Sequence, residues 1–147
     1  MKNKVVLDSC VFSKQFLEEE DSHQANALIE KLLMDKIHII VPKLWVYEVL
    51  ATVSIGDYSA IEVYELIIKL QKSLLHTVEL DEYCVNKIVD ICKTGHTKSG
   101  FPSFYDSSYH ALAILNNCYF VTADKRHFSK TKQFGNIALL SDWETAL

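Results

Sequence analysis

The chain has 147 residues, of which 49% are hydrophobic, and it carries a formal net charge of −4. This size and composition predict one globular domain, residues 1–147, and the acidic balance argues against a general polyanion binder, though not against a nucleic-acid enzyme whose acidic centre is neutralised by metal ions. No apolar stretch approaches the ~20 residues that span a bilayer, and the apolar run near the N-terminus is too short for a signal peptide, so we expect a soluble, cytoplasmic protein without membrane contacts.

Short apolar runs alternate with amphipathic stretches along the chain. Strands are predicted over residues 4–7, 37–41, 76–80, 118–122 and 137–141. Helices are predicted over residues 22–35, 43–53, 58–74, 81–95 and 103–117, with Ser22 as an N-cap and Pro42 in the first turn of the second helix. Because the strands are short and wholly apolar, this alternation predicts an α/β sandwich around a mostly parallel sheet that is buried on both faces.

The cysteine pattern indicates reduced thiols. Cys10, Cys84, Cys92 and Cys118 form no C-x-x-C pair and no zinc-ribbon spacing. Cys84 and Cys92 could be imagined as metal ligands together with His96, but a shared buried helix face is the preferred interpretation.

Four carboxylates stand where apolar segments end or are interrupted. Asp8 closes the first predicted strand, Asp124 follows the fourth by two residues, Asp106 lies in the first turn of a helix, and Glu48 is the only charged residue in "LWVYEVLA". Ligand sites of parallel sheets lie beyond the carboxyl ends of the strands. A cluster of unpaired negative charge there is costly unless it binds cations, and oxygen ligands suit Mg²⁺ or Mn²⁺.

Each carboxylate also has a structural interpretation. Asp8 and Asp124 could be helix N-caps, and Asp106 could form a capping box with Ser103. Glu48 could be a solvent-exposed position on a helix. We favour one shared site, because it accounts for all four positions at once.

The order of these four residues carries a family resemblance. Asp8, Glu48, Asp106 and Asp124, in "VVLDSCVF", "VPKLWVYEVLA", "YDSSYHALAI" and "FVTADKRHF", resemble the acidic quartet of PIN-domain ribonucleases, especially the VapC-type toxins of toxin–antitoxin pairs. The resemblance extends over almost the full chain, to the closing "IALLSDW". It implies a three-layer α/β/α fold around a five-stranded parallel sheet, and endoribonuclease activity that depends on Mg²⁺ or Mn²⁺.

The resemblance also implies roles for individual residues. Asp8, Asp106 and Asp124 are the candidate inner ligands, and Glu48 completes the set or orients a water. Ser9 and Thr122 match supporting hydroxyl positions. The sequence departs from the family at Cys10, where a polar residue such as Asn is usual, and the loop "GHTKSGFPS" is longer than in compact members.

Other residues near the quartet have open interpretations. The basic residues after Asp124 could contact RNA phosphates or form a solvated charged loop; these are Lys125, Arg126, Lys130 and Lys132. His110 lies one turn after Asp106, where a partly buried histidine on an apolar helix is favoured over a general acid. The nearby aromatic residues are interpreted as core or interface side chains rather than base-stacking platforms; these are Trp45, Tyr47, Tyr105 and Tyr109.

Apolar side chains in the helix predicted over residues 58–74 exceed what one buried face can hold; these are Ile61, Val63, Tyr64, Leu66, Ile67 and Ile68. The resemblance implies a homodimer and an antitoxin partner, with a monomeric two-sided core helix as the alternative. The alternative function is a non-catalytic PIN-like module that binds RNA or protein. A phosphatase of the haloacid-dehalogenase type is disfavoured, because it needs a second aspartate where Cys10 stands.

Overall fold

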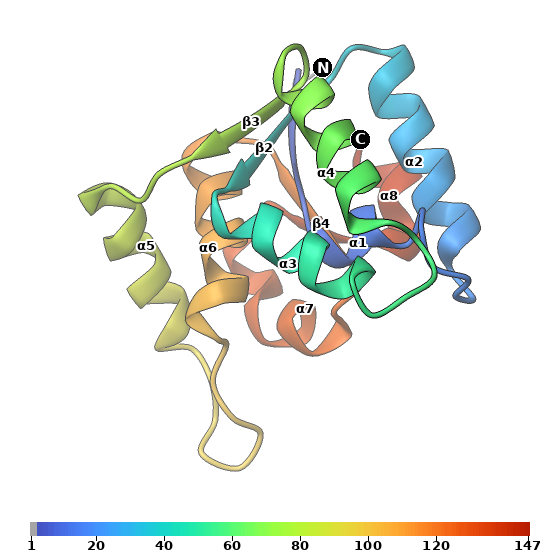
Figure 1. Cartoon of the computed structure of the whole chain (residues 1–147). Helices are drawn as coiled ribbons and strands as arrows, with labels where there is room; N and C mark the ends of the chain where they lie inside the picture. Colours follow the sequence, from blue (N-terminus) through green and yellow to red (C-terminus); the bar gives the residue numbers. More distant parts are fainter. Residues whose placement is uncertain (1–2) are drawn as a thin grey trace.

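Five parallel strands form one sheet in a computed structural model that describes residues 3–147 (Figure 1). The strand order is β3-β2-β1-β4-β5, and every neighbouring pair is parallel. The strands are β1 (Lys4–Leu7), β2 (His38–Pro42), β3 (Leu75–Val78), β4 (Tyr119–Thr122) and β5 (Ile137–Leu139). The predicted parallel sheet of five strands is confirmed.

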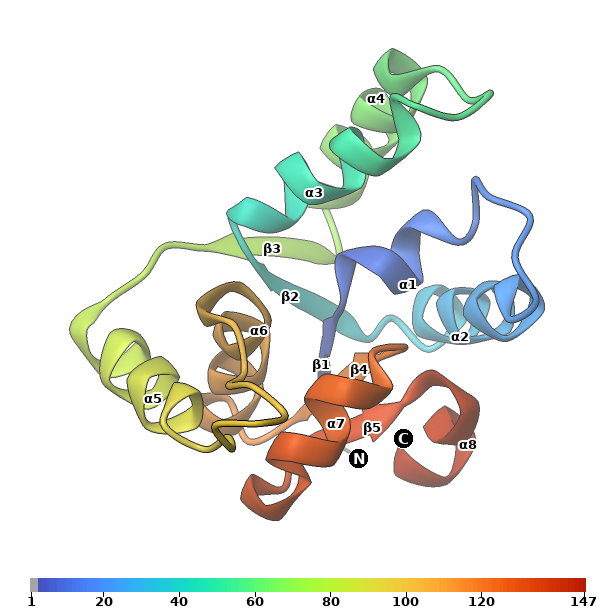
Figure 2. The same ribbon diagram turned by 90° about the horizontal axis from the view of Figure 1, so that it is seen from below.

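Helices cover both sides of this sheet. They are α1 (Ser9–Ser13), α2 (Ser22–Met34), α3 (Leu44–Val53), α4 (Ala60–Gln71), α5 (Glu82–Cys92), α6 (Phe104–Leu115), α7 (Lys125–Thr131) and α8 (Trp143–Ala146), with short 3-10 turns η1 (Lys132–Phe134) and η2 (Leu140–Asp142). Figure 2 shows α5 and α6 on one side of the sheet and α1 and α2 on the other, which gives the α/β/α layering. Within the described residues, no helix is long and apolar enough to cross a membrane.

Burial of the central strands explains their wholly apolar sequences. Val5, Val6 and Leu7 of β1 are fully buried, because α6 packs on the sheet from one side while α1, α2 and α3 fill the other. A strand that is covered on both faces has no solvent-facing positions, so it shows no polar alternation. The largest buried side chain is Trp45 of α3, which packs against Phe12 of α1 at 4.8 Å between ring centroids.

Several local predictions were wrong. The helices α1 and α7 were not predicted, although the side chains of Asp8 and Asp124 cap them. Ser22 is not the N-cap of α2: it is the first helical residue, and its hydroxyl donates to the Leu17 carbonyl at 2.7 Å. Pro42 ends β2 instead of starting α3. Proline cannot donate a hydrogen bond to a neighbouring strand, and this loss matters least at the last residue of a strand, where the pairing ends.

The carboxyl ends of the strands meet at one edge, and the helices of the candidate site begin there. The chain enters α1, α3 and α7 shortly after β1, β2 and β4. α6 returns to the same edge after the 93–103 loop, so its first turn lies near these ends (Figure 1). Side chains from the first two turns of four separate helices can therefore face a common space.

Candidate active site

Asp8 is the most buried carboxylate at this edge, with 8% of its surface exposed. Its backbone N–H donates to the Val121 carbonyl at 3.0 Å, which extends the pairing of β1 with β4. Its Oδ1 accepts from the Cys10 N–H at 3.3 Å, and its Oδ2 accepts from the Thr122 hydroxyl at 2.6 Å. Burial raises the pKa of Asp8 to about 6, and the neighbouring Asp106 adds to this rise, while hydrogen bonds from Thr122 and Cys10 oppose it.

Asp106 lies in the first turn of α6, and Ser103 caps this helix, which is one half of the capping box that the sequence suggested. The Ser103 hydroxyl accepts from the Asp106 N–H at 3.0 Å and donates to Asp106 Oδ2 at 2.9 Å. Burial raises the pKa of Asp106, the negative charge of Asp124 raises it further, and the bond from Ser103 lowers it. The negative charge of Asp106 also raises the pKa values of Asp8 and Glu48. Asp106 can therefore take part in capping α6 and still belong to the site.

Glu48 is half-buried on α3, next to the buried residues Trp45 and Val49. Its Oε1 accepts a hydrogen bond of 2.6 Å from the hydroxyl of Tyr109 on α6. Burial raises the pKa of Glu48, the bond from Tyr109 lowers it, and Asp106 raises it again. The contact with Tyr109 fixes Glu48 toward α6 and excludes a stray solvent-exposed position.

Asp124 caps α7 and is joined to Asp8 through one side chain. Its Oδ1 accepts from the N–H groups of Arg126 and His127 at 2.8 and 3.0 Å. The Thr122 hydroxyl that donates to Asp8 also accepts from the Asp124 N–H at 3.0 Å. Oδ2 of Asp124 has no hydrogen-bond partner in the described part of the chain, so this oxygen is available to a ligand.

All four carboxylates line a single cleft of about 580 Å³. The other lining residues are Ser9, Cys10, Lys14, Ala51, Thr52 and Ala123. Among the described residues, Lys14 is the only basic side chain in the cleft, and its ammonium pairs with Glu19 and Asp21. No ion pair reaches any of the four carboxylates within residues 3–147. Their charges are therefore uncompensated, which is the chemistry of an oxygen-ligand site for a divalent cation.

The four carboxylates share the cleft but do not form a compact ligand cluster. Within residues 3–147, no three Asp, Glu, His or Cys side chains lie close enough together to hold one ion. Three of the four lie in helix caps or first turns, and a donor set made of carboxylate oxygens fits a hard cation such as Mg²⁺ or Mn²⁺.

Comparisons with known proteins decide the family. The PIN domain sequence profile matches residues 5–133. The chain belongs to the PIN domain family. No curated protein sequence matches this PIN domain significantly.

Solved structures share the fold at low sequence identity. FitAB bound to the IR36 DNA fragment has a TM-score of 0.69 and 15% identity, covering 92% of this PIN domain and 94% of that chain. FitAcB from Neisseria gonorrhoeae has a TM-score of 0.66 and 17% identity, covering 95% and 98%. VapBC2 from Rickettsia felis, bound to a promoter DNA fragment, has a TM-score of 0.63 and 18% identity, covering 92% and 96%.

Cys10 takes the position at which this PIN domain departs from the usual polar residue. Its thiol is hydrogen-bonded to Asp8, and that bond lowers the pKa of the carboxyl group. Burial, followed by the negative charge of Asp8, raises the pKa of the Cys10 thiol. The thiol therefore stays neutral and supports Asp8 as a donor. The Ser9 hydroxyl lies 3.5 Å from Asp8 Oδ1, the outer limit of a hydrogen bond.

The predicted basic residues lie on α7 and η1, outside the lining of the acidic cleft. Lys125 lines a neighbouring pocket, while Lys130 lines another one beside the 94–99 loop. Arg126 and Lys132 are exposed. The structure thus gathers the acidic residues but spreads the basic ones.

Two of the four aromatic residues lie in the core, and the other two lie at the surface, where an interface position stays a prediction. Trp45 and Tyr109 are buried, whereas Tyr47 and Tyr105 are 79% and 65% exposed. The link from Tyr109 to Glu48 was missed, as was Lys14 in the cleft wall. The three-residue spacing from Asp106 to Tyr109 on one helix face was the available signal for the first.

His110 is fully buried, which goes beyond the partial burial that the sequence favoured. One ring nitrogen, Nε2, lies 2.7 Å from the Gly135 carbonyl, and burial lowers the pKa of His110 to about 4. A neutral, enclosed imidazole cannot serve as a general acid at neutral pH.

Proposed function

We propose that this PIN domain is a metal-dependent endoribonuclease that hydrolyses RNA phosphodiester bonds, and that it is the toxin of a toxin–antitoxin pair. One observation carries the nuclease proposal: Asp8, Glu48, Asp106 and Asp124 line one cleft with no basic side chain paired to them in the described residues. Carboxylates whose pKa values are raised by burial and by neighbouring negative charges are concentrated at functional sites.

Each carboxylate has a separate task in this proposal. Asp8, Asp106 and Asp124 hold Mg²⁺ or Mn²⁺, and Glu48 completes the ligand set or orients the attacking water. When bound, the cation lowers the pKa of a water molecule and stabilises the negative charge that develops on the phosphate.

Neighbouring residues keep these carboxylates in place. The Thr122 hydroxyl orients Asp8, with Ser9 at the limit of bonding distance, and the Tyr109 hydroxyl orients Glu48. Such outer contacts set the direction and the basicity of metal ligands. Lys125, Arg126, Lys130 and Lys132 extend beyond the cleft on α7 and η1, where they contact phosphates farther along the RNA.

The partner proposals rest on exposed apolar side chains. Val63 and Ile67 of α4 are buried, but Ile61, Tyr64 and Leu66 are 66%, 42% and 37% exposed. This remainder supports a homodimer interface. The structural neighbours FitAB, FitAcB and VapBC2 are complexes with antitoxin partners, which supports a cognate antitoxin for this PIN domain.

The nuclease proposal is tested by cleavage of labelled RNA with purified protein. We expect cutting with Mn²⁺ or Mg²⁺, none with EDTA, and none with Asp106→Asn. Asp90→Asn is the matched control, because Asp90 is an exposed residue on α5. Equal cleavage by Asp106→Asn, or cleavage that survives EDTA, would overturn the proposal. Co-purification with the product of the adjacent gene tests the antitoxin claim separately.

A further inference from the structure

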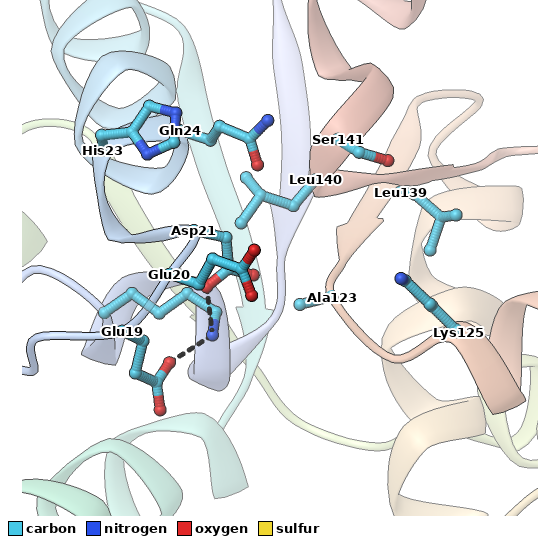
Figure 3. Close-up of a pocket in the computed structure, with 11 residues that line it drawn as sticks. Glu19, Glu20, Asp21, His23, Gln24, Ala123, Lys125, Leu139, Leu140 and Ser141 are labelled. Atoms are coloured by element: carbon cyan, nitrogen blue, oxygen red, sulfur yellow. Dashed lines mark hydrogen bonds and ion pairs between the residues drawn. The ribbon is translucent and has the colours of Figure 1, made fainter.

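A second pocket lies next to the acidic cleft and shares two lining residues with it. It has a volume of about 510 Å³ and lies between the start of α2 and residues 139–141 at the end of β5 (Figure 3). Lys14 and Ala123 line both this pocket and the acidic cleft. A nucleic-acid strand whose phosphate lies at the carboxylates therefore passes Ala123 to reach the second pocket.

The polar groups of this pocket are divided into paired and free ones. Lys14 holds Glu19 and Asp21, with its ammonium 2.9 Å from Asp21 Oδ1, and its side chain is only 11% exposed. This tie fixes the segment that carries Glu20. The carboxylate of Glu20 has no hydrogen bond or ion pair with any described residue, and the same holds for the side chain of Gln24.

The charge of the lining selects the kind of group that can enter. Two lysines, Lys14 and Lys125, face three carboxylates, so the sum is one negative charge. Lys14 is paired with Glu19 and Asp21, so the charges left free are the carboxylate of Glu20, which attracts N–H donors, and the ammonium of Lys125, which attracts a phosphate. Leu139, which is partly exposed, adds an apolar side chain to the lining, whereas Leu140 beside it is almost fully buried (Figure 3).

A nucleobase combines these properties, because it has a flat apolar face and a polar edge. Proteins read unpaired bases by hydrogen bonds to that edge and by contacts with its faces. The volume lies within the ~300–1,000 Å³ of small-molecule sites. Guanine alone among the four RNA bases presents two adjacent N–H donors on its pairing edge, which match the two oxygens of a carboxylate.

We propose that this pocket binds the base of a nucleotide flanking the scissile phosphate and prefers guanine through the carboxylate of Glu20. The inference rests on the proposed nuclease function and adds a specificity-determining residue to it. Lys125, at the same pocket, contacts the backbone phosphate of that nucleotide, and Lys14 is a positioning residue that acts through the Glu19–Asp21 segment.

The test is the base preference around the cut in a pool of random RNA, read by sequencing the products. We expect wild type to favour guanine at one position beside the cut. Glu20→Gln replaces one acceptor oxygen by a donor, and it should lower that preference about tenfold. Glu18→Gln is the matched control, since Glu18 is exposed and two residues away but does not line the pocket.

The outcomes separate this inference from the nuclease proposal. If wild type cuts and Glu20→Gln keeps its guanine preference, the base pocket is wrong while the nuclease stands. If wild type does not cut, the nuclease proposal fails, and binding of fluorescent hexanucleotides to Asp8→Asn decides the pocket: tighter binding of a guanine-containing strand, lost with Glu20→Gln, supports it, and equal binding refutes it. Should Glu20→Gln weaken only the association with the antitoxin, the pocket receives a protein side chain instead, and the nucleotide proposal is overturned.

Discussion

The hydroxyl of Thr122 donates a hydrogen bond of 2.6 Å to Oδ2 of Asp8, although 114 residues separate the two in the chain. The same hydroxyl oxygen accepts from the Asp124 N–H at 3.0 Å. One side chain at the end of β4 thus fixes the carboxylate that follows β1 and the backbone of the carboxylate that caps α7. Both residues lie at the same edge because β1 and β4 are paired in parallel.

Replacing Thr122 by valine removes this link while keeping the shape of the side chain. We expect affinity for Mn²⁺ to fall roughly 10- to 100-fold, as for other lost supports of metal ligands. Unfolding should also become easier by about 1–2 kcal/mol, because Asp8 and the Asp124 N–H lose a buried partner. Isothermal titration and urea denaturation measure the two effects. Thr145→Val, on α8, is the control and should leave Mn²⁺ affinity unchanged.

Asp8→Asn should stabilise the metal-free protein. The pKa of Asp8 is raised from 3.8 to about 6, so its charge is unfavourable in the folded state at neutral pH. Removing that charge should raise the free energy of unfolding by on the order of 1–3 kcal/mol at pH 7 in EDTA. Asp90→Asn should change it by less than about 0.5 kcal/mol. A less stable Asp8→Asn protein would contradict burial as the cause of the shift.

The gain from Asp8→Asn should depend on pH in one direction. A raised carboxyl pKa favours the protonated folded state, so the contribution of Asp8 to stability is fully present below pH 3.8 and is lost as pH rises through about 6. The difference between variant and wild type should therefore be largest above pH 6 and vanish near pH 4. Denaturation curves at pH 4, 5, 6 and 7, all in EDTA, check this; a difference that is constant across the series excludes the assignment.

The buried histidines change the stability of wild type and of Asp8→Asn equally between about pH 4 and pH 6.5. Burial lowers the pKa of His110 and of His127 from 6.5 to about 4. Their contribution to stability is present above pH 6.5 and is lost as pH falls through about 4. Comparing the two proteins at each pH cancels this loss, which is why the difference is the quantity to measure.

Tyr109→Phe should reduce cleavage while preserving the fold. The ring remains stacked on Phe120, at 5.5 Å between centroids, but Glu48 loses the hydroxyl that orients it. We expect a roughly tenfold lower cleavage rate at saturating Mn²⁺ and a stability change of about 1 kcal/mol. Tyr105→Phe is the control, because Tyr105 is exposed on the same helix and its hydroxyl has no hydrogen bond to a described residue. Equal rates for the two variants would remove Glu48 orientation from the mechanism.

Ile61→Glu should dissociate the proposed homodimer. A glutamate at this exposed position of α4 places a charge in an apolar interface, which should raise the dimer dissociation constant at least about tenfold. Light scattering over a concentration series measures it. Tyr83→Glu, at an exposed position of α5, serves as the control. A monomeric wild type at high micromolar concentration refutes the dimer.

The sequence by itself determined the layered architecture and the order of the strands along the chain. Strands buried on both faces must be apolar throughout, so Val5, Val6 and Leu7 identify β1 without any contact information. The sequence also shows where carboxylates interrupt the apolar pattern. Asp8 is the clearest case, because it follows directly after the buried residues of β1. The short helices α1 and α7 escaped detection because their start signals, Asp8 and Asp124, were the same residues that had a site interpretation, and five to seven residues show little helical periodicity.

Only the tertiary structure decided which side chains meet. The pairing of Tyr109 with Glu48, the diversion of Lys14 to Glu19 and Asp21, and the exposure of Tyr105 all depend on how α3, α6 and the α1–α2 loop pack in space. Local sequence determines the spacing of apolar and polar residues within each helix or strand, because that spacing involves only neighbours along the chain. Contacts between residues tens of positions apart follow from the parallel pairing of strands and the packing of helices on them, and those are properties of the whole fold.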